Sequence, residues 1–493
     1  MRTGSETSRE WSYDGPALNP TPPQPESPSG AVDLAIVGNG AVAMSIAIEH
    51  RRRVPDARIS VIGPERRPGS ASLAAGIMLA SHSEIEATTF RHAAGRAKFD
   101  LIRAAVADWP GWLDVLAAIA GLEPPKIRAG TVILDNPNVS GFDPPNFDAI
   151  LDALRRDGSD HELVDPADIR GYRPTPHLRA TRGVRVPSDG AIDAFAVMEL
   201  LDEAAAALGI ERIDGRAASV RDGIVHCDRG RVVHAERIVV AAGAASDGLL
   251  RGIPELDGRV PRILHGTGVG LRCRATPGLT TPDEVLRTPN RGAGLGVYHV
   301  PFGSDRFYLG ATNVVSVEPR EHARLGSLHL VLQSAMDEIS SELRHAECRM
   351  VTGHRPIGAD GFPLLGRTSV PGLWIATGTR RDGVTAAPEI ARRFVNELLG
   401  MDDGLPEPLS PERTPIVVLD RDQGIDVAVR SRLIGPGSST GVSAGRLEDE
   451  VRRQVVRLYD RAGLDVGVPA ELLDLYADGR LDASRLVAST NVD

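Results

Sequence analysis

Hydrophobic and polar positions divide the chain into regions of different character. Residues 1 to 30 are rich in Pro, Ser and Glu and poor in large apolar side chains, which predicts a disordered leader. From residue 32 onwards, VDLAIVGNGAVAMSIAIEHRRR predicts a short apolar strand, a glycine turn and a helix. ARISVIG predicts a second strand, so this region is expected to form a βαβ unit within about 30 residues.

Helices and strands alternate through the middle of the chain. Apolar strands that end in glycine recur near residues 243 and 378, far in sequence from the first βαβ unit. This order predicts one nucleotide-binding domain assembled from separated segments. The other expected elements are a helix over FAVMELLDEAAAALGI, a meander of strands over AASVRDGIVHCDRGRVVHAERIVVAAG, a hairpin over GLGVYHVPFGSDRFYLGATNVV, a helix over SLHLVLQSAMDEISSELRH, a strand over GLWIATG and a closing helix over GVTAAPEIARRFVNELLG.

The pattern changes again after residue 399. GMDDGLPEPLSPERTP has the composition of a linker, and the Gly/Ser-rich GPGSSTGVSAG that comes later predicts a loop. RLEDEVRRQVVRLYDRAGL then shows the periodicity of an amphipathic helix. We therefore expect residues 403–493 to form a partly helical C-terminal extension, in which no catalytic motif is recognised.

Composition and charge narrow the class of protein. Apolar residues make up 42% of the 493 residues and charged residues 25%, the balance of a soluble globular protein. The net charge of −10 favours neither a nucleic-acid nor an anionic membrane partner, and no run of about 18 apolar residues predicts a membrane span. Cys227, Cys273 and Cys348 lie far apart, so we expect no disulfide framework, no metal site and a cytoplasmic location.

A dinucleotide-binding motif lies at the first turn. GNGAVA matches G-x-G-x-x-A at Gly38, Gly40 and Ala43, directly after a predicted strand and at the start of a predicted helix. Gly38 would permit the tight turn, Gly40 a close approach to a pyrophosphate and Ala43 close helix packing. The acid that usually binds the ribose at the end of the second strand is replaced by Gly63, and Glu65 could serve instead if its loop bends inward.

A single arginine stands out in GHRPIGADGFPLLG, residues 353–366. Burying Arg355 is costly unless it meets an anion. The stretch therefore indicates either a structural ion pair, for example with Asp360, or a binding site for a negatively charged substrate.

Six motifs in order carry a resemblance to a known family. They are GNGAVA, SLAAGIMLASHSEIE, VVAAGAAS, YHVP with YLGAT, GHRPIGADGFPLLG and ATGTRRDGVTAAP, spread over about residues 32 to 400. With these motifs the sequence resembles the D-amino-acid oxidase family of FAD-dependent oxidoreductases, and most of all its glycine oxidase and thiamine-pathway branch. The resemblance implies an α/β fold in which a Rossmann-type FAD domain (31–95, 185–255 and 349–402) is interleaved with an antiparallel-sheet substrate domain (96–184 and 256–348).

The resemblance also assigns substrate-binding residues. In relatives the arginine of G-x-R-P binds the substrate carboxylate, and here this residue is Arg355. Tyr298 takes the place of a pocket tyrosine, and Arg381 that of an arginine near the carboxylate and the flavin, although a packed tyrosine and a surface arginine are the alternatives. Gly296 stands where glycine oxidases often carry a histidine, and Thr379 where relatives carry one, so the resemblance supports an amino-acid-like substrate better than glycine itself.

FAD is the implied cofactor, bound without a covalent bond. Relatives that tether the flavin use a Cys or a His where this chain has Gly353 or Leu73. Backbone N–H groups ahead of the closing helix are expected to face the flavin pyrimidine ring. The cofactor-binding residues implied are Gly38, Gly40, Ala43, Glu65, Ser72, Leu73, Ala74, Ala75, Gly76, Val220, Ala242, Gly243, Gly378, Arg381, Asp382, Gly383, Val384 and Thr385.

The expected activity is oxidation of a C–N bond in an amino acid or a small amine, with hydride transfer to the flavin and an imine as product. The substrate is expected to carry a carboxylate, the electron acceptor is O2 or another molecule, and a homo-oligomer is left open. Two alternatives remain: an enzyme of a specialised pathway with a non-amino-acid or carrier-bound substrate, and a non-catalytic flavin-bound partner subunit.

Overall fold

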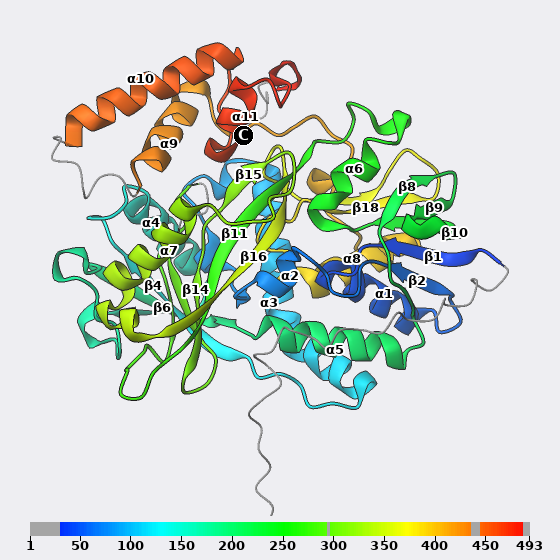
Figure 1. The fold of residues 1–493 in the computed structure, drawn as a ribbon, viewed down its shortest axis with the longest axis horizontal. Helices are drawn as coiled ribbons and strands as arrows, with labels where there is room; N and C mark the ends of the chain where they lie inside the picture. The colour runs from blue at the N-terminus through cyan, green and yellow to red at the C-terminus, as the bar shows by residue number, and fades with distance from the viewer. Residues whose placement is uncertain (1–29, 293–295, 435–443, 487–493) are drawn as a thin grey trace, which may run out of the picture.

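Two β-sheets, lying side by side, form the body of the protein (Figure 1). The computed structural model describes residues 30–292, 296–434 and 444–486. The predicted leader up to residue 29 and most of the predicted Gly/Ser-rich loop lie outside these residues. No helix in the described ranges is long and apolar enough to cross a membrane.

The first sheet is largely parallel and holds the βαβ unit. Its order is β17 (Leu364–Arg367), β18 (Leu373–Thr377), β10 (Val232–Val240), β1 (Val32–Val37), β2 (Ile59–Ile62) and β7 (Glu211–Ile213), and a hairpin of β8 (Ala217–Arg221) and β9 (Ile224–Cys227) joins β10. β18, β10, β1, β2 and β7 run parallel to one another, whereas β17 is antiparallel to β18. The three glycine-ended strands β1, β10 and β18 are therefore adjacent in one sheet, although their segments are far apart in sequence.

Helices cover one face of this sheet. Leu34 and Ile36 of β1 point into a core shared with α1 (Ala41–Arg53), α3 (Ala93–Ala120), α5 (Ala194–Ala207) and α8 (Ala387–Leu398). Ala35 and Val37, which alternate with them, point to the other face and pack with the β8–β9 hairpin and α6 (Ser246–Leu250). The apolar run of β1 thus reflects burial on both faces.

The second sheet is mainly antiparallel. Its order is β15 (Val314–Ser316), β11 (Ile263–Arg274), β14 (Arg306–Gly310), β13 (Tyr298–Pro301), β12 (Val285–Arg287), β4 (Arg128–Asp135), β6 (Arg182–Ala191) and β3 (Met78–Leu79), with β16 (Glu347–Gly358) paired to β11 and β5 (Glu162–Val164) to β6. α4 (Asp143–Arg156) packs on one face of it and α7 (Leu325–Ser334) on the other. The domain limits expected at residues 185 and 349 fall inside β6 and β16, so residues 185–191 and 349–358 belong to the second sheet.

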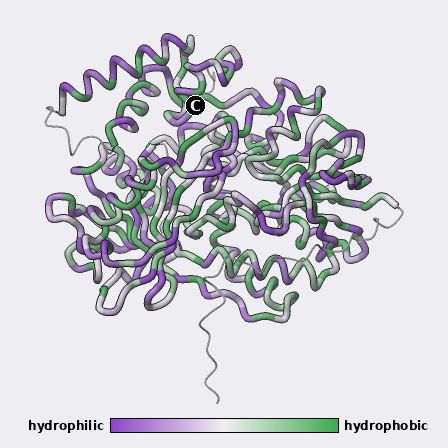
Figure 2. Tube along the Cα trace, viewed as in Figure 1, coloured by the Kyte–Doolittle hydropathy of each residue, from purple (hydrophilic) through white to green (hydrophobic). Residues whose placement is uncertain are grey.

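The C-terminal extension folds as a helical unit against the second sheet. It contains α9 (Arg421–Leu433), α10 (Ala444–Ala462) and α11 (Leu473–Ala477), and Figure 2 shows hydrophilic and hydrophobic positions alternating along α10. Val455 and Tyr459 of α10 share a core with Leu264 of β11 and Ile357 of β16. Arg413, in the linker before α9, pairs with the buried Asp360 at 2.9 Å. The extension is therefore attached through both apolar and ionic contacts.

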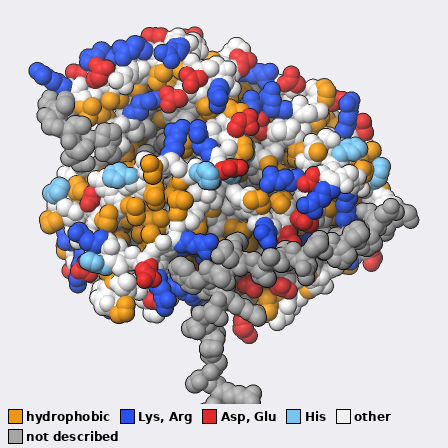
Figure 3. All heavy atoms as spheres, viewed as in Figure 1, with side chains coloured by type: hydrophobic (Ala, Val, Ile, Leu, Met, Phe, Trp, Pro, Cys, Tyr) orange, Lys and Arg blue, Asp and Glu red, His pale blue; other side chains and the backbone are white. Residues whose placement is uncertain are grey.

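A fully buried charge cluster stabilises the second sheet near α4. The guanidinium of Arg291 contacts Asp143 at 2.6 Å and Glu338 at 2.8 Å, and the three side chains are 1%, 0% and 4% exposed. On the face seen in Figure 3, by contrast, positive and negative side chains are interspersed in solvent. A buried charge is costly when its partner is removed, so the folded protein depends on Arg291 to compensate the charges of the two acids.

Replacing this arginine tests that role. Arg291→Met should lower the free energy of unfolding by about 3–5 kcal/mol, because two buried carboxylates lose their partner. Arg155→Met, which breaks an exposed pair with Asp152, should change it by less than about 0.5 kcal/mol. Both values can be measured by denaturant unfolding followed by circular dichroism, and equal effects would contradict a special role for Arg291.

Candidate active site

The G-x-G-x-x-A turn has the geometry that its sequence predicts. Gly38 has a φ of +121°, and a Cβ there would lie 2.2 Å from the carbonyl oxygen of Ala241, so only glycine fits. Gly40 is the N-cap of α1, and the N–H of Ala41 in the first turn donates to the Ser72 hydroxyl at 3.2 Å. Ala43 is fully buried against the core. The free end of α1 thus faces the 70–76 segment.

The other expected cofactor segments meet at the same place. A Cβ on Gly353 would lie 2.7 Å from the Cβ of Ala74, and one on Gly383 would lie 2.5 Å from the hydroxyl of Thr379 and 3.8 Å from Val42 of α1. The Thr385 hydroxyl donates to the carbonyl of Met78 at 2.9 Å. Segment 38–43 therefore lies against both 70–76 and 378–385, and the last of these is more than 300 residues away in sequence.

The strand ends complete this cradle. Gly243 has a left-handed φ of +59° and accepts a hydrogen bond from the Thr377 hydroxyl at 2.9 Å, which links the ends of β10 and β18. Gly378 follows with a φ of +71°. Val220 is buried on the other face of the sheet with Val37. A helix N-terminus, a hydroxyl and backbones without side chains are the groups that a pyrophosphate requires, so the glycine turns and Ser72 fit FAD, while a cofactor role of Val220 stays a prediction.

The place of the usual ribose-binding acid is filled by an amide. A Cβ on Gly63 would lie 2.5 Å from the Cγ of Asn39, and the Asn39 amide donates to the carbonyl of Pro64 at 2.9 Å. Glu65 is exposed, and its own N–H donates to Asp214. The motif residue Asn39 gave no signal in the sequence analysis, and the role of Glu65 stays a prediction.

On the substrate side, β11 carries glycines at alternate positions. Cβ atoms on Gly266, Gly268 and Gly270 would collide with the side chains of Ile357, Arg355 and Tyr308, respectively. Because alternate residues of a strand point to one face, these glycines leave a strip of that face without side chains. The side chains from the neighbouring strands β16 and β14 lie along this track. The Arg355 guanidinium occupies the middle of this track, where a Cβ on Gly268 would lie 2.1 Å from it.

Arg355 has neutral partners. It donates to the carbonyl of Thr312 at 2.8 Å and lies 3.5 Å from the side-chain oxygen of Asn313. No carboxylate of the described residues lies within 4.0 Å of it, and Asp360, the alternative partner, pairs with Arg413 instead. The fork of Arg355 is thus free to bind an anion.

Tyr298 lies next to this arginine. Its ring stacks on that of Tyr308, with centroids 5.9 Å apart, and Tyr308 in turn donates to the carbonyl of Ala74 at 2.8 Å. Burial raises the pKa of Tyr298 while the charge of Arg355 opposes this shift. The hydroxyl therefore stays protonated near neutral pH and can donate a hydrogen bond. His299 packs on Phe307 on the opposite face, as strand alternation predicts.

Arg381 lies in an ion-pair network instead of at the surface. It contacts Glu84 at 2.9 Å and Glu86 at 3.1 Å, and Glu84 also pairs with the buried Arg287. Burial would raise the pKa of Glu84, but the charges of Arg287 and Arg381, with further hydrogen bonds, outweigh it and lower this pKa to about 2. Glu84 and Arg287 were missed in the sequence analysis, although Glu84 lies within the motif SLAAGIMLASHSEIE.

Comparison with known proteins agrees with this geometry. The family model described as FAD dependent oxidoreductase (DAO) matches residues 33–397. The chain belongs to the DAO family of FAD-dependent oxidoreductases. FAD is the cofactor of this family, as the resemblance implied, and the α/β architecture with two sheets is that of its members.

Similar proteins include members of the glycine oxidase branch of the family. The bifunctional protein ThiO/ThiG of Nostoc sp. is 26% identical over 369 residues, which cover 72% of this chain and 51% of that protein. Glycine oxidase from Geobacillus kaustophilus matches with a TM-score of 0.65 at 21% identity. The match covers 78% of this chain and 99% of the glycine oxidase chain. Iminodiacetate oxidase from Chelativorans sp. BNC1 has a TM-score of 0.62 at 22% identity, with 77% and 98% covered. The chain spans about half the length of the curated ThiO/ThiG proteins that it matches.

The Glu84 network makes a prediction about pH. Because the pKa of Glu84 is lowered from 4.5 to about 2 on folding, its ionisation stabilises the folded protein above pH 4.5, and this contribution is lost as the pH falls towards 2. Glu84→Gln should therefore lower the free energy of unfolding by about 3 kcal/mol at pH 7 and by about half as much near pH 3. Denaturant unfolding at both pH values measures the difference.

Glu86 offers a matched control. Its side chain is 28% exposed, and among the described residues its one ion pair is with Arg381 at 3.1 Å, so Glu86→Gln should cost less than about 1 kcal/mol. A loss in Glu84→Gln that is the same at pH 7 and pH 3 would contradict the proposed pKa shift.

Proposed function

We propose that this member of the DAO family oxidises the C–N bond of an amino acid or a related small amine that carries a carboxylate. The observation that supports this most strongly is Arg355, a part-buried guanidinium without a carboxylate partner among the described residues. Gly353 precedes it by two residues on the same face of β16 and contacts the cofactor segment at Ala74. A carboxylate on Arg355 would therefore lie next to the flavin site.

The chain's own residues bind and orient the substrate. Arg355 would hold the carboxylate through two parallel hydrogen bonds, and the protonated hydroxyl of Tyr298 can donate a third. Arg381 is fixed by its ion pairs with Glu84 and Glu86, so its side chain would keep one orientation beside the substrate. Bound FAD would supply the hydride acceptor, so that the α-carbon of the amine would lose a hydride and the product would be an imine, which water hydrolyses. An amine that enters neutral needs no side-chain base, and catalysis then rests on positioning.

Cofactor binding follows the same proposal. The N–H groups of α1 and the Ser72 hydroxyl would hold the pyrophosphate without a covalent bond to the protein. The backbone from Asp382 to Thr385 leads into α8, whose N-terminal N–H groups would favour negative charge on the flavin pyrimidine ring. Lys98 pairs with Asp382 at 2.6 Å and keeps this segment in place.

A spectroscopic assay separates the candidate functions. Anaerobic mixing of the flavin-loaded protein with a panel of amino acids and amines should bleach the flavin absorbance with at least one carboxylate-bearing amine. Bleaching only by amines without a carboxylate would favour the specialised-pathway alternative, and no bleaching by any amine would favour a non-catalytic subunit. Oxygen consumption compared with dye reduction then separates an oxidase from a dehydrogenase.

Arg355 can be tested directly. Arg355→Met should raise KM for the carboxylate substrate by about 100-fold or more, because two charge-assisted hydrogen bonds are lost, while FAD stays bound. Arg355→Lys should have a smaller effect, since it keeps the charge but loses the planar fork. Steady-state kinetics and the flavin spectrum give both readings, and an unchanged KM in Arg355→Met would assign the residue a structural role.

A further inference from the structure

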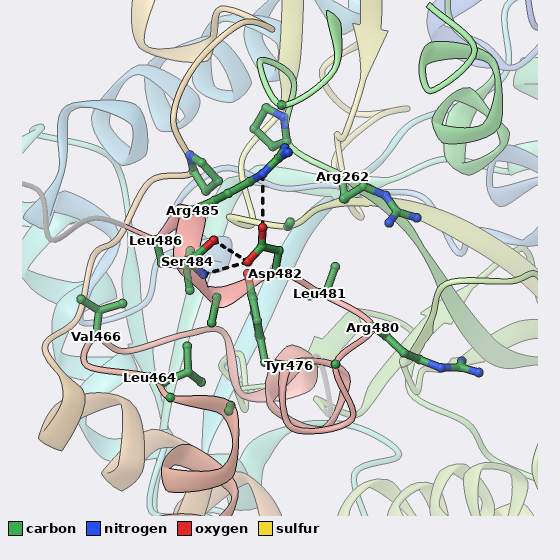
Figure 4. A pocket seen from close by; sticks show the side chains of 18 of the residues that line it. Arg262, Leu464, Val466, Tyr476, Arg480, Leu481, Asp482, Ser484, Arg485 and Leu486 are labelled. Atoms are coloured by element: carbon green, nitrogen blue, oxygen red, sulfur yellow. Dashed lines mark hydrogen bonds and ion pairs between the residues drawn. The ribbon is translucent and has the colours of Figure 1, made fainter. Parts of the chain in front are cut away.

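Two cavities lie between the C-terminal extension and the body. The larger, of about 930 Å³, is lined by Arg262, Tyr476, Arg480 and Asp482 among others, and Asp482 accepts hydrogen bonds from Ser484 within it (Figure 4). None of its lining residues belongs to the candidate active site. The smaller, of about 450 Å³, is lined by Glu84, Glu86 and Arg381 and so adjoins that site.

The extension supplies one wall of the smaller cavity. Its α9 presents Gln423, Asp426, Val427 and Arg430, whose spacing places them on one face of the helix. The opposite wall comes from the start of α3 and the turn before it, which includes Arg91. Arg380 pairs with Glu471 of the extension and closes one side. The cavity therefore exists only because the extension packs against the body.

The acidic and the basic side chains that line this cavity differ in whether they have ion-pair partners. Its acids all have arginine partners: Glu84 and Glu86 pair with Arg381, Asp360 with Arg413, Asp426 with Arg452 and Glu471 with Arg380.

Two arginines that line the cavity, Arg91 and Arg430, have no carboxylate partner among the described residues, whereas the acids all have arginine partners. Arg91 contacts only the neutral side-chain oxygen of Gln423, at 3.3 Å. Arg430 lies over the ring of Phe142 at 5.3 Å and near the backbone carbonyl of Asp426 at 3.5 Å. Neither has a carboxylate within 4.0 Å among the residues that the structure describes. Two solvent-exposed guanidinium groups on opposite walls therefore face the opening of the cavity, where an anion could bind them.

We propose that this cavity binds the far end of the substrate and that the substrate carries a second carboxylate, held by Arg91 and Arg430. The inference rests on the proposed amine oxidation, since it extends the same site outwards through Glu84 and Arg381. A volume of about 450 Å³ is many times that of one water molecule, about 30 Å³, and lies in the usual range of small-molecule sites. The substrate class is therefore an amine with two carboxylates, longer than glycine.

Binding of molecules without an amine tests the cavity independently of turnover. Titration calorimetry on the flavin-loaded protein would compare malonate, succinate, glutarate and adipate with monocarboxylates of the same chain length. At least one dicarboxylate should bind about tenfold or more tightly than its monocarboxylate counterpart, because it gains a charge-assisted contact. Arg430→Gln and Arg91→Gln should each remove this advantage.

Arg432 gives the matched control on the same helix. It pairs with Asp474 at 2.7 Å and does not line the cavity, so Arg432→Gln should keep the advantage. Equal binding of dicarboxylates and monocarboxylates at every length, or an advantage that survives both Arg91→Gln and Arg430→Gln, would overturn the inference. A dicarboxylate advantage that depends on both arginines would support the site even if no amine reduced the flavin, and that second result would overturn the proposed oxidation instead.

Discussion

The pairing of β11 with β16 is the constraint on which the candidate site depends. The two strands pair over twelve residues from Ile263↔Gly358 to Arg274↔Glu347. The alternate glycines of β11 leave this face without side chains of its own, so Arg355 and Tyr308 can lie flat across it. Two residues before Arg355, β16 contacts the segment around Ala74 through Gly353. One strand therefore sets the distance between the cofactor cradle and the arginine that faces the substrate.

Much of the fold could be predicted because its signals are local. Gly38 and Gly40 need only a strand before them and a helix after them, and Gly243 and Gly378 each end an apolar strand. The order of the six motifs then indicated the family, which the comparison confirmed. The domain limits were harder, since the expected limits fall within β6 and β16, and a strand's sequence does not say which sheet it joins.

The ion-pair network could not be predicted, because its members meet only in the folded chain. Arg287 and Glu84 are 203 positions apart, and the residues around each show no pattern that names the other. Asn39 fills the space over Gly63, a contact between side chain and backbone that becomes visible only when β1 and β2 are paired. The sequence also predicted helices in the C-terminal extension, but their packing beside Glu84 and Arg381 depends on contacts such as Arg413 with Asp360.

A crystal structure of the flavin-loaded protein with a bound, non-oxidisable carboxylate would test the central claim most directly. We expect a carboxylate held by both terminal nitrogens of Arg355 and by the Tyr298 hydroxyl, with the α-carbon of the ligand facing the flavin. A carboxylate bound elsewhere, with Arg355 still donating to the carbonyl of Thr312 alone, would contradict it.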